Sequence, residues 1–171
     1  DTEPLIHLIY AAIAEAARLL KERDLNLNDA DAQATAQILG VNAIKYADIS
    51  NNRIHDYVFS YERMLRFEGN TAAFLMYAYV RIQSLKRRAN IEPTVYLRAP
   101  IQLIEVAEID LGMHLLRFEE VLQQITDDLL PNRLCEYLFN LAEKFNVFFR
   151  DCRVEGTPQQ NQRLHLCDVT A

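Results

Sequence analysis

Residues 71–89 read TAAFLMYAYVRIQSLKRRA, and their spacing predicts a helix with two distinct faces. At about 100° per residue, one arc of this helix is apolar, which is typical of a stripe that faces a core. Its members are Leu75, Ala78, Ile82, Leu85 and Ala89. A second arc, about 80° wide, mixes aromatic and cationic side chains. It carries Phe74, Tyr77, Arg81, Ser84 and Arg88.

The second arc, called the stripe below, is compatible with RNA binding. Aromatic rings stack on unpaired bases, and arginine both stacks on bases and pairs with phosphates. Spacing alone favours a structural interpretation, in which the aromatic residues mark the edge of the core. The run from Lys86 to Arg88 would then interact with the helix dipole. The stripe is therefore a candidate RNA-binding surface that needs support from other features.

The charge of the chain is unevenly distributed. A formal net charge of −6 argues against nucleic-acid binding when the whole chain is summed. From Arg81 to Pro100, however, five positive side chains stand against one negative side chain, a net of +4. Residues 1–37 carry seven acids against three bases, a net of −4. Because phosphates respond to local potential, the sequence predicts a basic surface beside the stripe.

The rest of the 171 residues predicts an all-α helical bundle. With 4 Gly and 5 Pro, the chain has too few turn-forming residues for a typical β-sandwich or β-barrel. Asp29–Asp31 and either Asn70 or Thr71 are the expected helix caps. We interpret the final helix, which still runs at Ala171, as truncated. The expected helices cover residues 4–22, 29–48, 71–89, 100–130 with a kink near Gly112, 131–150 and 159–171.

No catalytic, metal-binding or membrane motif is recognisable in the sequence. It contains no GxGxxG, GxxxxGK[ST], HExxH or GxSxG pattern. The four histidines and three cysteines are scattered without the short spacings of a zinc site. An odd set of cysteines is typical of reduced, intracellular thiols. No stretch approaches the roughly 18–20 apolar residues of a membrane span, and no signal peptide is recognisable. We therefore expect a cytoplasmic chain without a metal site or an active site of its own.

Two longer stretches resemble a known family. Residues 43–82 read AIKYADISNNRIHDYVFSYERMLRFEGNTAAFLMYAYVRI, and residues 130–156 read LPNRLCEYLFNLAEKFNVFFRDCRVEG, with RLHLC following at 163–167. The strings KYADIS, DYVF, FEGNT and YAYVRI, in this order and spacing, resemble the C-terminal anticodon-binding domain (DALR type) of arginyl-tRNA synthetases. The resemblance covers the chain from residue 38 on. The opening DTEPLI is similar to the sequence just past the class I signature loop.

The resemblance implies a set of tRNA-binding residues. In the family, aromatic residues at the positions of Phe74 and Tyr77 and a basic residue at Arg81 face the anticodon loop, as does an aromatic residue at Phe149. The stripe adds Arg88 to this candidate set. Phenylalanine stands at positions 74 and 149, where tyrosine is common in the family. Stacking survives that change, but any hydrogen bond from a tyrosine hydroxyl is lost.

The resemblance also implies how the protein is organised. Residues 1–37 would be linking helices from the end of a catalytic domain, and residues 38–171 would form the anticodon-binding bundle. The whole enzyme would attach arginine to tRNA(Arg), with ATP and Mg bound in a catalytic domain that this chain lacks. We therefore expect this chain to hold no cofactor and to be inactive alone. Its expected partners are the tRNA(Arg) anticodon loop and the catalytic domain of the same chain, without membrane or DNA, and we expect a monomer.

Two alternatives remain open from the sequence. The chain could be a helical protein–protein interaction module that does not bind RNA. It could also be the equivalent domain of another class I synthetase, such as the cysteine enzyme. An interaction module does not need a stripe of aromatic and basic side chains. The strings GNT–YAYVRI and LPNRLCEYL favour the arginine family over the cysteine family.

Overall fold

The structure is a computed structural model, and it describes residues 4–23, 27–56 and 58–171. These residues form nine helices and no strand, so the predicted all-α fold is confirmed for the part of the chain that is described. The chain divides into two compact units, Asp1–Phe74 with Leu130–Cys135, and Leu75–Leu129 with Glu136–Ala171. The opening DTE, the expected helix break at 24–26 and the aromatic position 57 lie outside the described residues.

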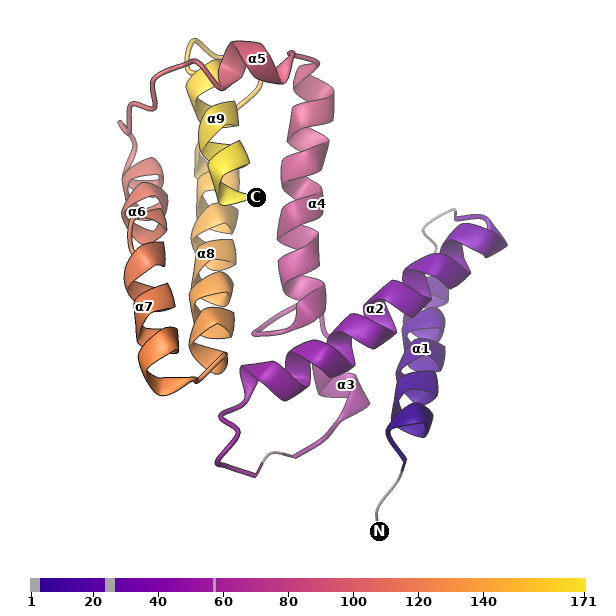
Figure 1. The fold of residues 1–171 in the computed structure, drawn as a ribbon. Helices are drawn as coiled ribbons and strands as arrows, with labels where there is room; N and C mark the ends of the chain where they lie inside the picture. The colour runs from indigo at the N-terminus through magenta and orange to yellow at the C-terminus, as the bar shows by residue number, and fades with distance from the viewer. Residues whose placement is uncertain (1–3, 24–26, 57) are drawn as a thin grey trace. The chain divides into compact units, whose positions relative to one another are not determined.

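The first unit is built on a hairpin of α1 (Leu5–Glu22) and α2 (Asp29–Ser50), with the short α3 (Tyr61–Met64) next to α2 (Figure 1). Asn28 caps α2, because its side chain accepts a 2.8 Å hydrogen bond from the backbone N–H of Asp31. The expectation that Asp29–Asp31 would provide this cap is therefore wrong. Both acidic side chains instead lie in the first turn, where the helix dipole favours them.

Small residues allow α1 and α2 to pack closely. Ala12, Ala16, Ala36 and Ala43 are buried, and Gly40 lies directly against the backbone of α1. A Cβ atom at Gly40 would stand 2.6 Å from the backbone nitrogen of Ile13. The close approach of the two helix backbones therefore requires glycine at this position.

The second unit surrounds the aromatic face of α8 (Asn132–Asp151). Phe145 and Phe148 of α8 are fully buried and form the centre of its core with Leu111 and Leu164. In Figure 1, α6 and α7 lie along one side of α8. The other helices of the unit are most of α4 (Ala72–Ala89), α5 (Pro93–Tyr96), α6 (Val106–Leu115), α7 (Phe118–Asp128) and α9 (Gln160–Thr170).

The helix predicted to begin at Pro100 begins instead at Val106, so that prediction is wrong. Glu105 and Glu108 form a capping box at the start of α6. One carboxylate oxygen of Glu108 accepts hydrogen bonds from the backbone N–H groups of Ile104 and Glu105, at 2.8 and 2.9 Å. This cap fixes the start of the helix, although the apolar spacing continues back towards Pro100.

The kink expected near Gly112 is also misplaced. Gly112 lies inside α6, and the break between α6 and α7 falls at Leu116 and Arg117. A Cβ atom at Gly112 would stand 2.5 Å from Cδ1 of Leu103. Glycine therefore serves the packing of the preceding loop on α6, and not a bend of the helix.

A buried ion pair joins the start of α6 to α9. The Nε of Arg163 donates a 2.6 Å hydrogen bond to Glu108, and both side chains are more than nine-tenths buried. Arg163 also donates to the backbone carbonyl of Arg153, at 2.7 Å. Burial alone would raise the pKa of Glu108, but the two backbone donors and Arg163 together hold that pKa below its usual range.

Replacing Glu108 by glutamine is expected to lower the free energy of unfolding by about 3–5 kcal/mol, because Arg163 would remain buried without its counter-charge. Denaturant unfolding followed by circular dichroism measures this change. Glu15→Gln is the matched control, since it removes one partner of the exposed pair between Glu15 and Arg18 and should change stability by less than about 1 kcal/mol.

The difference in free energy of unfolding between wild type and Glu108→Gln should also depend on pH. Because the folded pKa of Glu108 is depressed, its contribution is present above the ordinary value of 4.5 and is lost as the pH falls through the folded value. The stability gap between wild type and Glu108→Gln should therefore narrow in acid. A gap that stays constant in acid would contradict this assignment.

Gly40→Ala is expected to destabilise the packing of α1 on α2 by about 1–3 kcal/mol. The added methyl group would meet backbone atoms of Ala12 and Ile13, which cannot move without shifting the helix. Gly112→Ala should cost less, because the methyl group would meet only the Leu103 side chain. Urea unfolding of the two variants compares these costs, and equal losses would argue against the backbone contact.

Candidate nucleic-acid interface

Helix α4 carries the stripe, and Thr71 caps the N-terminus of this helix. The Thr71 hydroxyl accepts a 3.2 Å hydrogen bond from the backbone N–H of Phe74 and donates a 2.6 Å hydrogen bond to the carbonyl of Arg66. Of the two expected caps, Asn70 and Thr71, it is Thr71 that caps α4. The apolar arc of α4 faces the core as predicted, with Ala78, Ile82 and Leu85 buried.

Four side chains of the second unit, called the Arg81 cluster, join α4 to α8. They are Tyr77, Arg81, Asn146 and Phe149. The guanidinium carbon of Arg81 lies 4.4 Å from the ring centroid of Tyr77 and 4.9 Å from that of Phe149. Both distances are within the range of a cation–π interaction. The cluster thus brings together three of the five residues predicted to bind tRNA.

Hydrogen bonds fix the orientation of Arg81 within this cluster. One terminal nitrogen donates to Oδ1 of Asn146 at 2.6 Å, and the other donates to the hydroxyl of Tyr77 at 3.2 Å. Both acceptors are neutral. Within the described part of the chain, no carboxylate pairs with Arg81, so its positive charge remains available to an anion.

The ring of Tyr77 is accessible to a ligand. Tyr77 is 45% exposed. Phe149 is half-buried and packs 6.1 Å from the ring of Phe145. Phe74 is also half-buried. It lies in the first turn of α4, and this turn belongs to the first unit.

Arg88 differs from Arg81 because a carboxylate already holds it. Its Nε donates a 2.8 Å hydrogen bond to Glu155 in an ion pair whose members are 55% and 35% exposed. Lys86 is similarly paired with Asp168, and this hydrogen bond raises the pKa of the lysine. Two of the five positive charges between Arg81 and Pro100 are therefore compensated by acids far along the chain. The local surplus of +4 overstates the basic surface.

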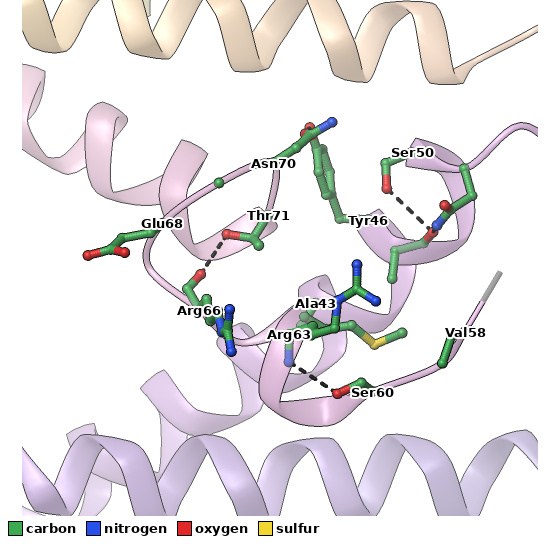
Figure 2. A pocket seen from close by; sticks show the side chains of 14 residues that line it. Ala43, Tyr46, Ser50, Val58, Ser60, Arg63, Arg66, Glu68, Asn70 and Thr71 are labelled. Carbon is green, nitrogen blue, oxygen red and sulfur yellow. Dashed lines mark hydrogen bonds between the residues drawn. The ribbon is translucent and has the colours of Figure 1, made fainter.

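A polar hollow of ≈ 390 Å³, called the α2–α3 hollow, opens in the first unit (Figure 2). Tyr46 forms part of its wall, and its hydroxyl lies 2.6 Å from Oδ1 of Asn70 and 3.1 Å from the carbonyl of Cys135. Burial, together with the contact with Cys135, raises the pKa of Tyr46 well above its usual range. The lining residues used below are Tyr46, Ser50, Asn51, Ser60, Arg63 and Thr71.

Neither Asn146, nor Glu155, nor this hollow was predicted from the sequence. Asn146 lies three residues before Phe149 on α8, so helical spacing placed it on the same face. The pairing of Arg88 with Glu155 joins residues 67 positions apart, and no local pattern reveals it. The hollow likewise depends on residues contributed by α2, α3 and the loop before α4.

The described residues show neither a metal cluster nor a membrane-spanning helix. They contain no group of three or more His, Cys, Asp or Glu side chains that could hold a metal ion. None of their helices is long and apolar enough to cross a membrane. The three cysteines are buried and free.

A family model described as "DALR anticodon binding domain" matches residues 75–171, which is more than half of the chain. The chain belongs to the DALR anticodon-binding family. A second model, described as "tRNA synthetases class I (R), catalytic domain", matches residues 1–61. The resemblance seen in the sequence is therefore confirmed, and the matched DALR segment includes Tyr77, Arg81, Arg88 and Phe149.

Individual relatives agree with the family match. The chain is 58% identical over 173 residues to an arginine–tRNA ligase of Protochlamydia amoebophila, covering 100% of this chain and 30% of the relative. It is 51% identical over 163 residues to an arginine–tRNA ligase of Chlamydia felis, covering 95% of this chain and 29% of that relative. The chain therefore spans about 30% of the length of these curated relatives.

A solved structure shares both the fold and part of the sequence. The arginyl-tRNA synthetase of Plasmodium falciparum superposes with a TM-score of 0.85 at 33% identity, covering 97% of this chain and 30% of that chain. This match covers both units of the DALR-family chain.

Asn146→Ala is expected to release the guanidinium of Arg81 in this DALR-family chain. With Asn146 and Tyr77 both accepting, rotation about the Cζ–Nε bond is hindered, and the terminal N–H resonances of Arg81 should be resolved by NMR. These resonances should merge in Asn146→Ala and remain resolved in Asn146→Asp, which retains an acceptor oxygen. Merged resonances in the wild-type chain would contradict the clamped geometry.

Proposed function

We propose that this chain is the anticodon-loop-binding module of an arginine–tRNA ligase. The Arg81 cluster is the observation that carries the proposal, because it places an unneutralised guanidinium beside an exposed ring. The DALR family match and the names of the relatives support the same function. They also favour the arginine family over the cysteine family and over a module that does not bind RNA.

The cluster suggests how such a module binds RNA. The guanidinium of Arg81 attracts a backbone phosphate, and an unpaired base stacks on the accessible face of Tyr77. Phe149 supports Arg81 from α8, and Phe74 extends the aromatic surface along α4. Arg88 contributes only after its side chain leaves Glu155, so it acts later or more weakly than Arg81.

The longer protein would carry the chemistry. Residues 1–37 would link this module to a catalytic domain that uses ATP and Mg, while residues 38–171 would bind the anticodon loop. The exposed apolar side chains Leu5, Ile6 and Tyr10 of α1 support a contact with that domain. Binding energy gained at the anticodon loop would then help to place the acceptor end of the tRNA for reaction. A cytoplasmic, monomeric enzyme remains our expectation.

Tyr77→Ala and Arg81→Ala test the proposal. Loss of one stacked base is worth about 1–3 kcal/mol, so Tyr77→Ala should weaken binding of an arginine tRNA transcript by roughly 5- to 150-fold. Arg81→Ala should also reduce the dependence of affinity on salt, because one phosphate contact is lost. Fluorescence anisotropy with labelled tRNA measures both effects.

Matched controls lie on the same helix. Tyr79→Ala removes another exposed tyrosine, and Arg87→Ala removes another exposed arginine, yet neither residue belongs to the Arg81 cluster. Both controls should bind tRNA nearly as tightly as the wild type. Equal losses in controls and cluster variants, with helicity unchanged, would refute the assignment of the interface.

A further inference from the structure

The α2–α3 hollow holds an arginine that the proposed function does not use. Figure 2 shows the Arg63 side chain pointing into the hollow, while the carboxylate of Glu68 points away from it. The side chain of Arg66, also at the hollow, is paired with Glu62 at 2.8 Å. In the described part of the chain, no carboxylate pairs with the guanidinium of Arg63.

The other groups around Arg63 suit a phosphate with its sugar. The Ser60 hydroxyl accepts from the backbone N–H of Arg63 and keeps its own proton to donate. Ser50 and Asn51, by contrast, already donate to the carbonyl of Ala47 and contribute polar surface. A volume of ≈ 390 Å³ lies within the usual range of sites for small ligands. An arginine without an acidic partner attracts an anion that carries several hydrogen-bond acceptors. A phosphodiester has this chemistry.

The hollow reaches the residue that caps α4. Thr71 lines the hollow and also caps α4, and Phe74 follows in the first turn of the same helix. Thr71, Phe74 and the hollow all belong to the first unit. Three residues of helix span about 5 Å along the axis, so an RNA strand that reaches Phe74 is close to the hollow.

We propose that the α2–α3 hollow binds a backbone phosphate of the same RNA strand whose neighbouring base stacks on Phe74. Arg63 donates to that phosphate, and the Ser60 hydroxyl supplies a second donor. This inference rests on the proposed function, since it adds a second contact for the same RNA. The segment before α4, whose Thr71 already caps this helix, would then also contact the RNA directly.

Arg63→Ala tests the proposal, and Arg53→Ala is its matched control. Arg53 is an exposed arginine of the same segment, and it does not line the hollow. Arg63→Ala should weaken binding of the arginine tRNA transcript by about tenfold and reduce the salt slope by about 0.7, the value for one single-strand phosphate. Arg53→Ala should change neither, and Arg63→Lys should retain most of the slope.

Phosphate-ethylation interference locates the contact on the RNA. One ethylated phosphate should block binding to the wild-type chain and lose its effect with Arg63→Ala. The proposal is overturned if Arg63→Ala behaves like Arg53→Ala while Tyr77→Ala still weakens binding, and the proposed function then stands. It is also overturned if inorganic phosphate but not RNA shifts the Arg63 resonances, which would indicate a free-anion site. If the wild-type chain binds no tRNA, both proposals fail together.

Discussion

The proposed binding surface depends on how the positive charge of Arg81 is held. Two aromatic rings, an amide oxygen and a phenol oxygen surround its guanidinium. The other cations discussed in the second unit have acidic partners, since Lys86 pairs with Asp168, Arg88 with Glu155 and Arg163 with Glu108. Neutral partners order a cation without cancelling its charge, whereas a carboxylate must be displaced before a phosphate can bind. The fold therefore distinguishes a positioned cation from cations that serve structure.

Much of the fold could be predicted because its long helices are periodic. The boundaries of α1, α4 and α8 follow the apolar spacing closely, and the core arc of α4 is buried where the spacing placed it. The start of α6 could not be predicted in this way, because apolar residues continue upstream of it. Its position depends on Glu108, whose carboxylate caps the helix and pairs with Arg163, 55 residues away.

The candidate site was predictable only in part, for a related reason. Helical spacing grouped Tyr77 with Arg81, and both lie in one cluster. Spacing gave no information on which charges are neutralised, because ion pairs such as Arg88 with Glu155 join distant parts of the chain. The sum of charges from Arg81 to Pro100 therefore overestimates the net positive charge of this surface, because two of its five cations pair with acids elsewhere in the chain. The exposure of Arg63 in a polar hollow depends on several elements and has no signature in the sequence.

A single helix sets the order of the proposed contacts. Helix α4 starts in the first unit and continues in the second, so the spacing of its side chains is fixed by helical geometry. Phe74 and Arg81 are separated by seven residues, or about 10 Å along the axis. The hollow ends at Thr71, the cap of the same helix. Under the proposed function, an RNA strand that follows α4 would therefore meet Phe74 before Arg81 and Arg88, because the register of the helix fixes this order.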